Sequence, residues 1–331
     1  MNYKLFIGID VSKEKIDVWI HPTKKHEIFE NQESGFKKMI NWITKITEHK
    51  NQLWLFCFEH TGLYSLPLSL FLTEQNIHFV LSPALEIKRS LGITRGKSDL
   101  IDAQKIAEYA YLKREELKPT ILPGKPLIKL QQLISLRERL VRQRAGFITS
   151  AKEYKSMLKE TDNSQLFETH RNMIENLSKE IETLEQSIRD TIKEDEIMAK
   201  QFGLLTSIKG IGLIVAAYLI MSTHCFQRFE TWRQYACYAG IAPFEYSSGS
   251  SIRGKTRVSH LANKQIKALL HLAASTAILH DPELKEYYQK RVEQKKSKMS
   301  TLNIVRNKLI SRAFAVVKRE TPYVNIKKYS A

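Results

Sequence analysis

The stretch Leu5-Phe6-Ile7-Gly8-Ile9-Asp10-Val11-Ser12-Lys13 decides the fold of the first third of this 331-residue chain. Its apolar run predicts a buried strand over Tyr3–Asp10, and the polar residues after it predict a turn into a second strand over Ile16–His21. A further apolar run predicts a buried strand over Leu53–Glu59. The first and third of these strands each end in an acidic residue, so two carboxylates are expected at strand ends.

Two more acids lie three residues apart at the start of a helix expected over residues 99–112, and residues at positions i and i+3 share a helix face. Carboxylates that converge on one point repel one another unless a cation lies between them, and Mg²⁺ prefers oxygen ligands. Paired ions can activate an attacking oxygen and stabilise a leaving oxygen at a phosphate. We therefore expect a site for two Mg²⁺ ions, which Mn²⁺ can replace, with the ligands Asp10, Glu59, Asp99 and Asp102.

Each acid also has an ordinary alternative role. Taken alone, such a residue is more often a helix cap or a solvated side chain, and Asp99 follows Ser98 where a helix dipole favours negative charge. The combination of two strand-end acids with a helical pair favours the metal site. Arg95 and Lys97 flank it and are candidates for contact with a phosphate, although a surface role at the helix start explains them equally well.

The charge of the chain indicates a polyanionic partner. Lys and Arg number 52 against 35 Asp and Glu, which gives a net charge of +17. The excess is concentrated in two stretches, Lys125–Lys159 and Lys285–Arg319, and nucleic acid is the usual partner of such surfaces. Long helices that merely solvate themselves would normally carry matching glutamates.

Composition excludes several other classes. Cys57, Cys225 and Cys237 are too few and too badly spaced for a disulfide framework or a zinc knuckle. The longest apolar run, Ile211–Met221, is too short to span a bilayer, and the chain shows no signal peptide. We expect a cytoplasmic, nucleoid-associated protein that makes no use of a membrane.

The pattern along the chain divides it into four parts. Residues 1–118 alternate strands and helices, with further helices expected over 36–47 and 66–74 and a short strand over 78–81. Prolines and a glycine mark a linker over 119–126. Residues 127–200 are expected to be helical, and residues 201–331 to form a mostly helical C-terminal domain. The helical region carries four candidate nucleic-acid contacts: Arg137, Arg139, Arg142 and Arg144.

The second helix of this region has a coiled-coil seam, made of Ile174, Leu177, Ile181, Leu184 and Ile188. Such a seam serves a helical hairpin within one chain or a dimer between chains. The break at Thr161-Asp162-Asn163-Ser164 favours a hairpin of two antiparallel arms.

Two C-terminal segments are candidates for phosphate chemistry. Ser207-Ile208-Lys209-Gly210-Ile211-Gly212 is typical of a helix-hairpin-helix turn, whose amide groups approach phosphate, although a plain packing turn has the same pattern. Phe244–Arg257 is expected to be a loop with four serines and the bases Arg253, Lys255 and Arg257. Composition alone favours a structural loop, and the alternative is a serine nucleophile with bases that neutralise a phosphate.

These motifs together resemble the DEDD transposases of bacterial insertion sequences, the group that includes the Piv-type DNA invertases. The matching segments occur in the family's order along nearly the whole chain. They are Gly8–Lys13, Glu59–Tyr64, Lys97–Ala103, Ile208–Gly212, Tyr238–Pro243 and Ser247–Gly249.

The resemblance implies a RuvC-like domain of RNase H fold followed by a C-terminal transposase domain. It makes the four acids a metal site and Ser248 a nucleophile that attacks a DNA phosphodiester, leaving a phosphoserine and a free 3′ hydroxyl. It also implies a dimer or tetramer in which the acids of one subunit meet the serine of another. A structured noncoding bridge RNA would select donor and target DNA.

The chain departs from the family pattern at two places. It has Leu261-Ala262-Asn263 where the family has Lys or Arg followed by Gly-Asn, and Ser250-Ser251-Ile252 lengthens the serine loop. Ser247, Ser250 and Ser251 therefore stay open as alternative nucleophiles. Two rival functions also stay open: a RuvC-like resolvase that uses metal-activated water, and a basic nucleic-acid-binding factor without activity.

Overall fold

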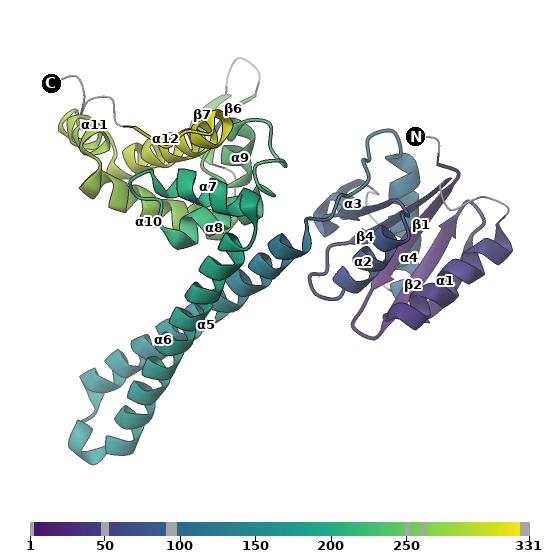
Figure 1. Ribbon diagram of the computed structural model, residues 1–331, viewed down its shortest axis with the longest axis horizontal. Coiled ribbons are helices and arrows are strands. Elements are labelled where there is room, and N and C mark those ends of the chain that lie inside the picture. Colours follow the sequence, from purple (N-terminus) through teal and green to yellow (C-terminus); the bar gives the residue numbers. More distant parts are fainter. Residues whose placement is uncertain (1–2, 48–52, 91–97, 249–251, 259–261, 325–331) are drawn as a thin grey trace. The chain divides into compact units, whose positions relative to one another are not determined.

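A computed structural model of the chain describes residues 3–47, 53–90, 98–248, 252–258 and 262–324, with only the backbone described for 245–248 and 252–257. The chain is mixed α/β and mostly helical, and it divides into an N-terminal unit, Met1–Leu122, and a C-terminal unit, Pro123–Ala331 (Figure 1). No described helix combines the length and the apolar character that crossing a membrane requires.

Five strands form the sheet of the N-terminal unit: β1 (Leu5–Val11), β2 (Lys15–His21), β3 (Lys25–Glu30), β4 (Trp54–Glu59) and β5 (Phe79–Ser82). Their order is β3-β2-β1-β4-β5, antiparallel from β3 to β1 and parallel from β1 to β5. The structure confirms the four strands expected from the apolar runs. It adds β3, an edge strand whose mostly charged residues give no apolar pattern.

Helices cover both faces of this sheet: α1 (Glu33–Ile46) and α2 (Leu66–Glu74) on one face, α3 (Ala84–Ser90) and α4 (Asp99–Leu112) on the other. Alternate residues of β1 face opposite layers. Ile7 and Ile9 are buried against α1 and α2, whereas Phe6 lies in the cluster with α3 and α4. The three expected helices are confirmed, and α3 was not predicted.

Gly8 of β1 marks the closest approach of α4 to the sheet. A Cβ at this position would lie 2.2 Å from both the carbonyl oxygen of Ala103 and the amide nitrogen of Ala107. Both atoms belong to the backbone of α4, so a side chain at Gly8 would force the helix away from β1. The glycine thus fixes where the helix that carries Asp99 and Asp102 crosses the strand that carries Asp10.

The C-terminal unit begins with a long helical hairpin. α5 (Lys125–Met157) and α6 (Ser164–Lys193) run antiparallel, joined through the short helix η2 (Glu160–Asp162), and they lie side by side in Figure 1. Of the predicted seam, Ile181 and Ile188 are buried. The break in the pattern at residues 161–164 therefore does correspond to the turn between two arms.

The rest of this unit consists of α7 (Glu196–Thr206), α8 (Leu213–Ser222), α9 (Trp232–Tyr238), β6 (Pro243–Ser248), β7 (Ile252–Val258), α10 (Lys264–His280), α11 (Pro282–Glu293) and α12 (Lys298–Arg319). The prediction of a loop over Phe244–Arg257 was wrong, because β6 and β7 pair as an antiparallel hairpin. The apolar residues are few, Phe244 and Tyr246 in β6 and Ile252 and Val258 in β7, and the small and charged residues between them weaken the strand pattern around the serine- and glycine-rich turn.

We predict that Gly8→Ala destabilises the protein by about 1–3 kcal/mol or more, because the new Cβ has backbone rather than flexible side-chain atoms as neighbours. Urea unfolding measures the effect. Gly146→Ala is the matched control, since Gly146 lies in α5 with open space around its Cβ position. That change should stabilise by about 0.5–1 kcal/mol through helix propensity. Equal effects of the two substitutions would contradict the proposed role of Gly8.

Candidate metal centre and nucleic-acid interface

The four predicted acids come from three elements of the N-terminal unit. Asp10 lies near the end of β1, and Glu59 is the last residue of the parallel neighbour β4. Asp99 is the first residue of α4, and Asp102 lies in the first turn of that helix. The Ser98 hydroxyl caps the helix by accepting a hydrogen bond from the amide of Ile101 at 3.3 Å.

Electrostatic coupling shows that these acids lie near one another. The pKa of Asp10 is raised to about 6, first by burial and then by the negative charges of Asp99, Asp102, Glu59 and Asp17. The pKa of Glu59 is also raised, by burial and by the charge of Asp102. Every predicted ligand therefore takes part in one group of mutually repelling carboxylates.

The donor set fits a hard divalent cation. All four side chains offer carboxylate oxygens, the ligands that Mg²⁺ and Ca²⁺ prefer, and a cation would relieve the repulsion among them. Within the part of the chain that the structure describes, no three histidine, cysteine or acidic residues lie close enough together to ligate an ion as they stand. The ligand assignment consequently stays a prediction, supported by the donor chemistry and the electrostatic coupling.

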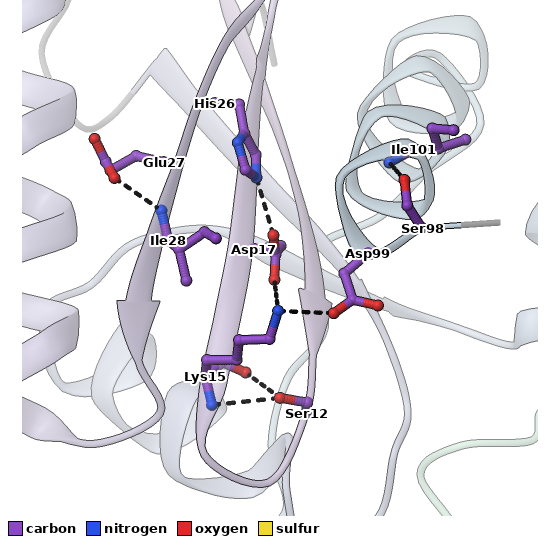
Figure 2. Close-up of polar contacts among 9 residues, drawn as sticks. All are labelled: Ser12, Lys15, Asp17, His26, Glu27, Ile28, Ser98, Asp99 and Ile101. Atoms are coloured by element: carbon purple, nitrogen blue, oxygen red, sulfur yellow. Dashed lines mark hydrogen bonds and ion pairs between the residues drawn. The ribbon is translucent and has the colours of Figure 1, made fainter.

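A basic side chain that the sequence did not single out contacts this group. Lys15 Nζ lies 2.8 Å from Asp99 Oδ2 and 3.2 Å from Asp17 Oδ2 (Figure 2). Asp17 is buried and its other oxygen, Oδ1, lies 3.0 Å from His26 Nε2. Asp17 is the register partner of Asp10 across the β1–β2 pair, so the alternation along β2 could have placed it on the same face.

The predicted nucleophile, Ser248, is the last residue of β6, where it pairs with Ile252. The neighbouring Ser247 pairs with Arg253, and the alternatives Ser250 and Ser251 lie outside the described residues. Arg257 pairs with Phe244 beyond a register irregularity in the hairpin, so strict alternation does not extend from Arg253 to Arg257. The hairpin thus pairs Ser247 and Ser248 with the first residues of the strand that carries the three predicted bases.

Three asparagines hold the chain on either side of this hairpin. Asn303 and Asn307 of α12 both donate side-chain hydrogen bonds to the carbonyl of Ile241, at 2.8 and 3.2 Å. Asn263, which the family pattern retains, caps α10 by accepting from the amides of Gln265 and Ile266, each at 3.1 Å. Asn263 therefore caps a helix even though Ala262 precedes it where the family pattern has glycine.

The two glycines of the turn between α7 and α8 differ in their surroundings. Gly210 has a φ of +95°, and a Cβ there would lie 2.5 Å from the carbonyl oxygen of Ala273 in α10. Gly212 precedes α8 with open space at its Cβ position, and Lys209 is exposed. Gly210 thus has a packing role, and the phosphate contact expected at Lys209 stays a prediction.

The predicted contacts on the helical hairpin also divide into two kinds. Arg137 forms an ion pair with Glu185 of α6, with Nη2 at 2.6 Å from Oε1, and Arg144 donates to the Ser178 hydroxyl at 3.1 Å. Arg139 and Arg142 are exposed. The first two arginines tie α5 to α6, whereas the exposed pair is open to a ligand. The predicted contacts Arg95 and Lys97 lie outside the described residues.

Comparison with known proteins covers both units. A family model described as "Transposase IS116/IS110/IS902 family" matches residues 203–289, and a model of DEDD transposases of IS110 elements, described as "Transposase", matches residues 7–161. The pilin gene-inverting protein of Moraxella bovis is 27% identical over 328 residues, covering 97% of this chain and 98% of that protein. An insertion element IS110 protein of Streptomyces coelicolor is 32% identical over 120 residues, covering 36% of this chain and 29% of that protein.

We predict that the metal-free protein loses stability as pH rises from about 4 to 6. The folded-state pKa of Asp10 lies above its unfolded value, so the native state binds more protons in this interval and its stability falls as they leave. Because Asp10 is only half-buried, we expect an effect on the order of 1 kcal/mol. Urea unfolding in EDTA at both ends of the interval measures it.

Asp10→Asn should remove this component of the pH dependence, so the difference in unfolding free energy between variant and wild type should grow toward neutral pH. A difference that stays constant with pH would contradict the coupling of Asp10 to the other acids.

Proposed function

Because the chain carries the transposase domains of the IS110 family and is thus a DNA recombinase, we propose that it cuts and exchanges DNA strands through a serine nucleophile and a Mg²⁺-dependent carboxylate site. The family is generally dependent on divalent metal ions. The observation that supports the metal site in this chain is the raised pKa of Asp10, which reflects burial together with three other predicted ligands.

The sheet topology supports an RNase H-like N-terminal unit. An order of β3-β2-β1-β4-β5, with only β1, β4 and β5 parallel, places the ends of β1 and β4 side by side. α4 begins at the same end of the sheet, since its first residue pairs with Lys15 at the start of β2. Such an arrangement collects acids from strands and from a helix start at one edge, which is what a phosphate-cleaving metal site needs.

The chemistry that we propose is a transesterification. The Ser248 hydroxyl attacks a DNA phosphorus, an Oγ–P bond forms, and the P–O3′ bond breaks. The serine proton ends on the released 3′ hydroxyl, and reversal of the step with a different strand completes the exchange. A bound divalent cation, held by Asp10, Glu59, Asp99 and Asp102, would supply Lewis-acid stabilisation of charge on the phosphate oxygens.

We further propose two nucleic-acid surfaces, on the hairpin and on the C-terminal helices. The first is marked by Arg139 and Arg142 of α5, both exposed. The second follows α11 and the start of α12, where Lys285, Lys290, Lys295, Lys296 and Lys298 are exposed. Their partners are the element-end and target DNA and, as the family resemblance implies, a noncoding guide RNA bound by a homo-oligomer.

We predict that the full-length protein, incubated with Mg²⁺, element-end DNA and the adjoining transcript, forms a covalent adduct with DNA that survives denaturation. Ser248→Ala should abolish the adduct, because the hydroxyl is the attacking group, and Asp10→Asn should reduce it by at least about a hundredfold. Ser247→Ala is the matched control and should retain the adduct. Denaturing gel electrophoresis of labelled DNA measures all four reactions.

Nicked DNA without any adduct would identify water as the nucleophile and replace this proposal with a RuvC-like resolvase. An adduct retained in Ser248→Ala and lost in Ser247→Ala would move the nucleophile by one residue.

We also predict that Arg139→Gln and Arg142→Gln each weaken nucleic-acid binding and lower the slope of log affinity against log salt by about 1, because each removes one phosphate contact. Lys179→Gln is the control, since Lys179 is an exposed α6 residue paired with Glu175 at 2.8 Å. Fluorescence anisotropy at several salt concentrations gives the slopes. Equal slopes for the arginine variants and the control would show that the hairpin makes no phosphate contact there.

A further inference from the structure

Hydrogen bonds of its backbone and ion pairs of its side chain fix Lys15 at the predicted metal site. The Ser12 amide and hydroxyl both donate to the carbonyl oxygen of Lys15, at 3.0 and 2.7 Å, and the Lys15 amide donates back to the Ser12 hydroxyl at 3.3 Å. These bonds fix the turn between β1 and β2. From this turn the lysine side chain reaches across to Asp99, the first residue of α4 (Figure 2).

The two carboxylates that Lys15 contacts differ in burial. The side chain of Asp17 is 5% exposed, whereas that of Asp99 is 53% exposed. The buried carboxylate also contacts His26 and cannot turn toward solvent, so it keeps the ammonium in place. Exposed ion pairs contribute little to stability, so the pair with Asp99 is the one that can be exchanged.

We propose that Lys15 is a built-in counter-ion of the metal site, which neutralises Asp99 in the metal-free protein and contacts a nucleic-acid phosphate once Asp99 ligates a divalent cation. This inference rests on the proposed function of the four acids as a metal site. Asp17 and His26 are positioning residues in this arrangement, since they hold the lysine and do not themselves reach the substrate.

The balance of charge around Lys15 changes when a cation binds. In the metal-free state the ammonium offsets one of several neighbouring carboxylates, and it competes with an added cation for Asp99. When a divalent cation takes that carboxylate, the lysine stays beside a cationic centre through its contact with Asp17. A phosphate oxygen is the anionic group that a DNA or RNA strand brings to this position, and it would replace Asp99 as the partner of the ammonium.

The first test measures the affinity of the protein for Mn²⁺ alone. Electron paramagnetic resonance reports the concentration of the free ion. Lys15→Met should bind Mn²⁺ about three- to tenfold more tightly than the wild type, because a competing positive charge is removed. Lys15→Arg, which keeps the charge, should bind like the wild type. Lys37→Met is the control, since Lys37 pairs with Glu33 in α1 at 2.7 Å and is also exposed.

Nucleic-acid affinity is the second test and should move in the opposite direction. In a Ser248→Ala background, Lys15→Met should weaken binding of a DNA duplex in the presence of Mn²⁺ and lower the salt slope by about 1, whereas Lys37→Met should not. If Lys15 had only a structural role, its substitution would destabilise the fold and so weaken both affinities. Thermal unfolding of each variant would report that loss of stability. Lys15→Gln replaces Lys15→Met, with the same expectations, where the apolar side chain impairs folding.

The outcomes separate this inference from the function on which it rests. Tight Mn²⁺ binding by the wild type that Lys15→Met leaves unchanged or weakens would overturn the counter-ion role while the metal site stands. An unchanged salt slope would overturn the phosphate contact. Mn²⁺ binding that Asp10→Asn does not weaken would overturn the metal site itself and this inference with it.

Discussion

The backbone of α4 passes over β1 so closely at Gly8 that a Cβ there would lie 2.2 Å from backbone atoms of the helix. This contact sets the height and the position of α4 on the sheet. Since Asp99 and Asp102 stand in the first turn of that helix, their distance from Asp10 depends on it. A displaced helix would leave the strand-end acids where they are and separate them from the helical pair.

The four predicted ligands lie in different electrostatic surroundings. Asp99 and Asp102, two of the predicted ligands, lie in the first turn of α4, where the helix dipole favours negative charge. Asp10 lies near the end of β1 and Glu59 at the end of β4, and burial is the first cause that raises the pKa of each. Of the two described ion pairs of Lys15, the one with the exposed carboxylate lies on the helix side, at Asp99.

Sequence patterns predicted the elements that are long, apolar or clearly bounded. β1, β4 and α4 were found because apolar runs end at acids or follow a capping serine, and these elements carry all four predicted ligands. The edge strand β3 and the hairpin of β6 and β7 were missed or assigned to a loop because charged and small residues weaken the alternation on which a strand prediction relies. The role of Lys15 depends on sheet register, which pairs Asp10 with Asp17 and cannot be derived from either strand alone.

The net charge of the chain is likewise an incomplete guide to function. The basic stretches predicted a nucleic-acid surface, yet several of their residues are used to hold the fold. Arg137 pairs with Glu185, Arg312 pairs with Asp281 and Glu283, and Arg306 is buried against His271. Internal partners remove these cations from any binding surface, so the net charge overstates what nucleic acid can meet. The proposed interface is better sought among the exposed basic residues of these stretches, such as Arg139 and Arg142 of α5 and Lys285 and Lys290 of α11.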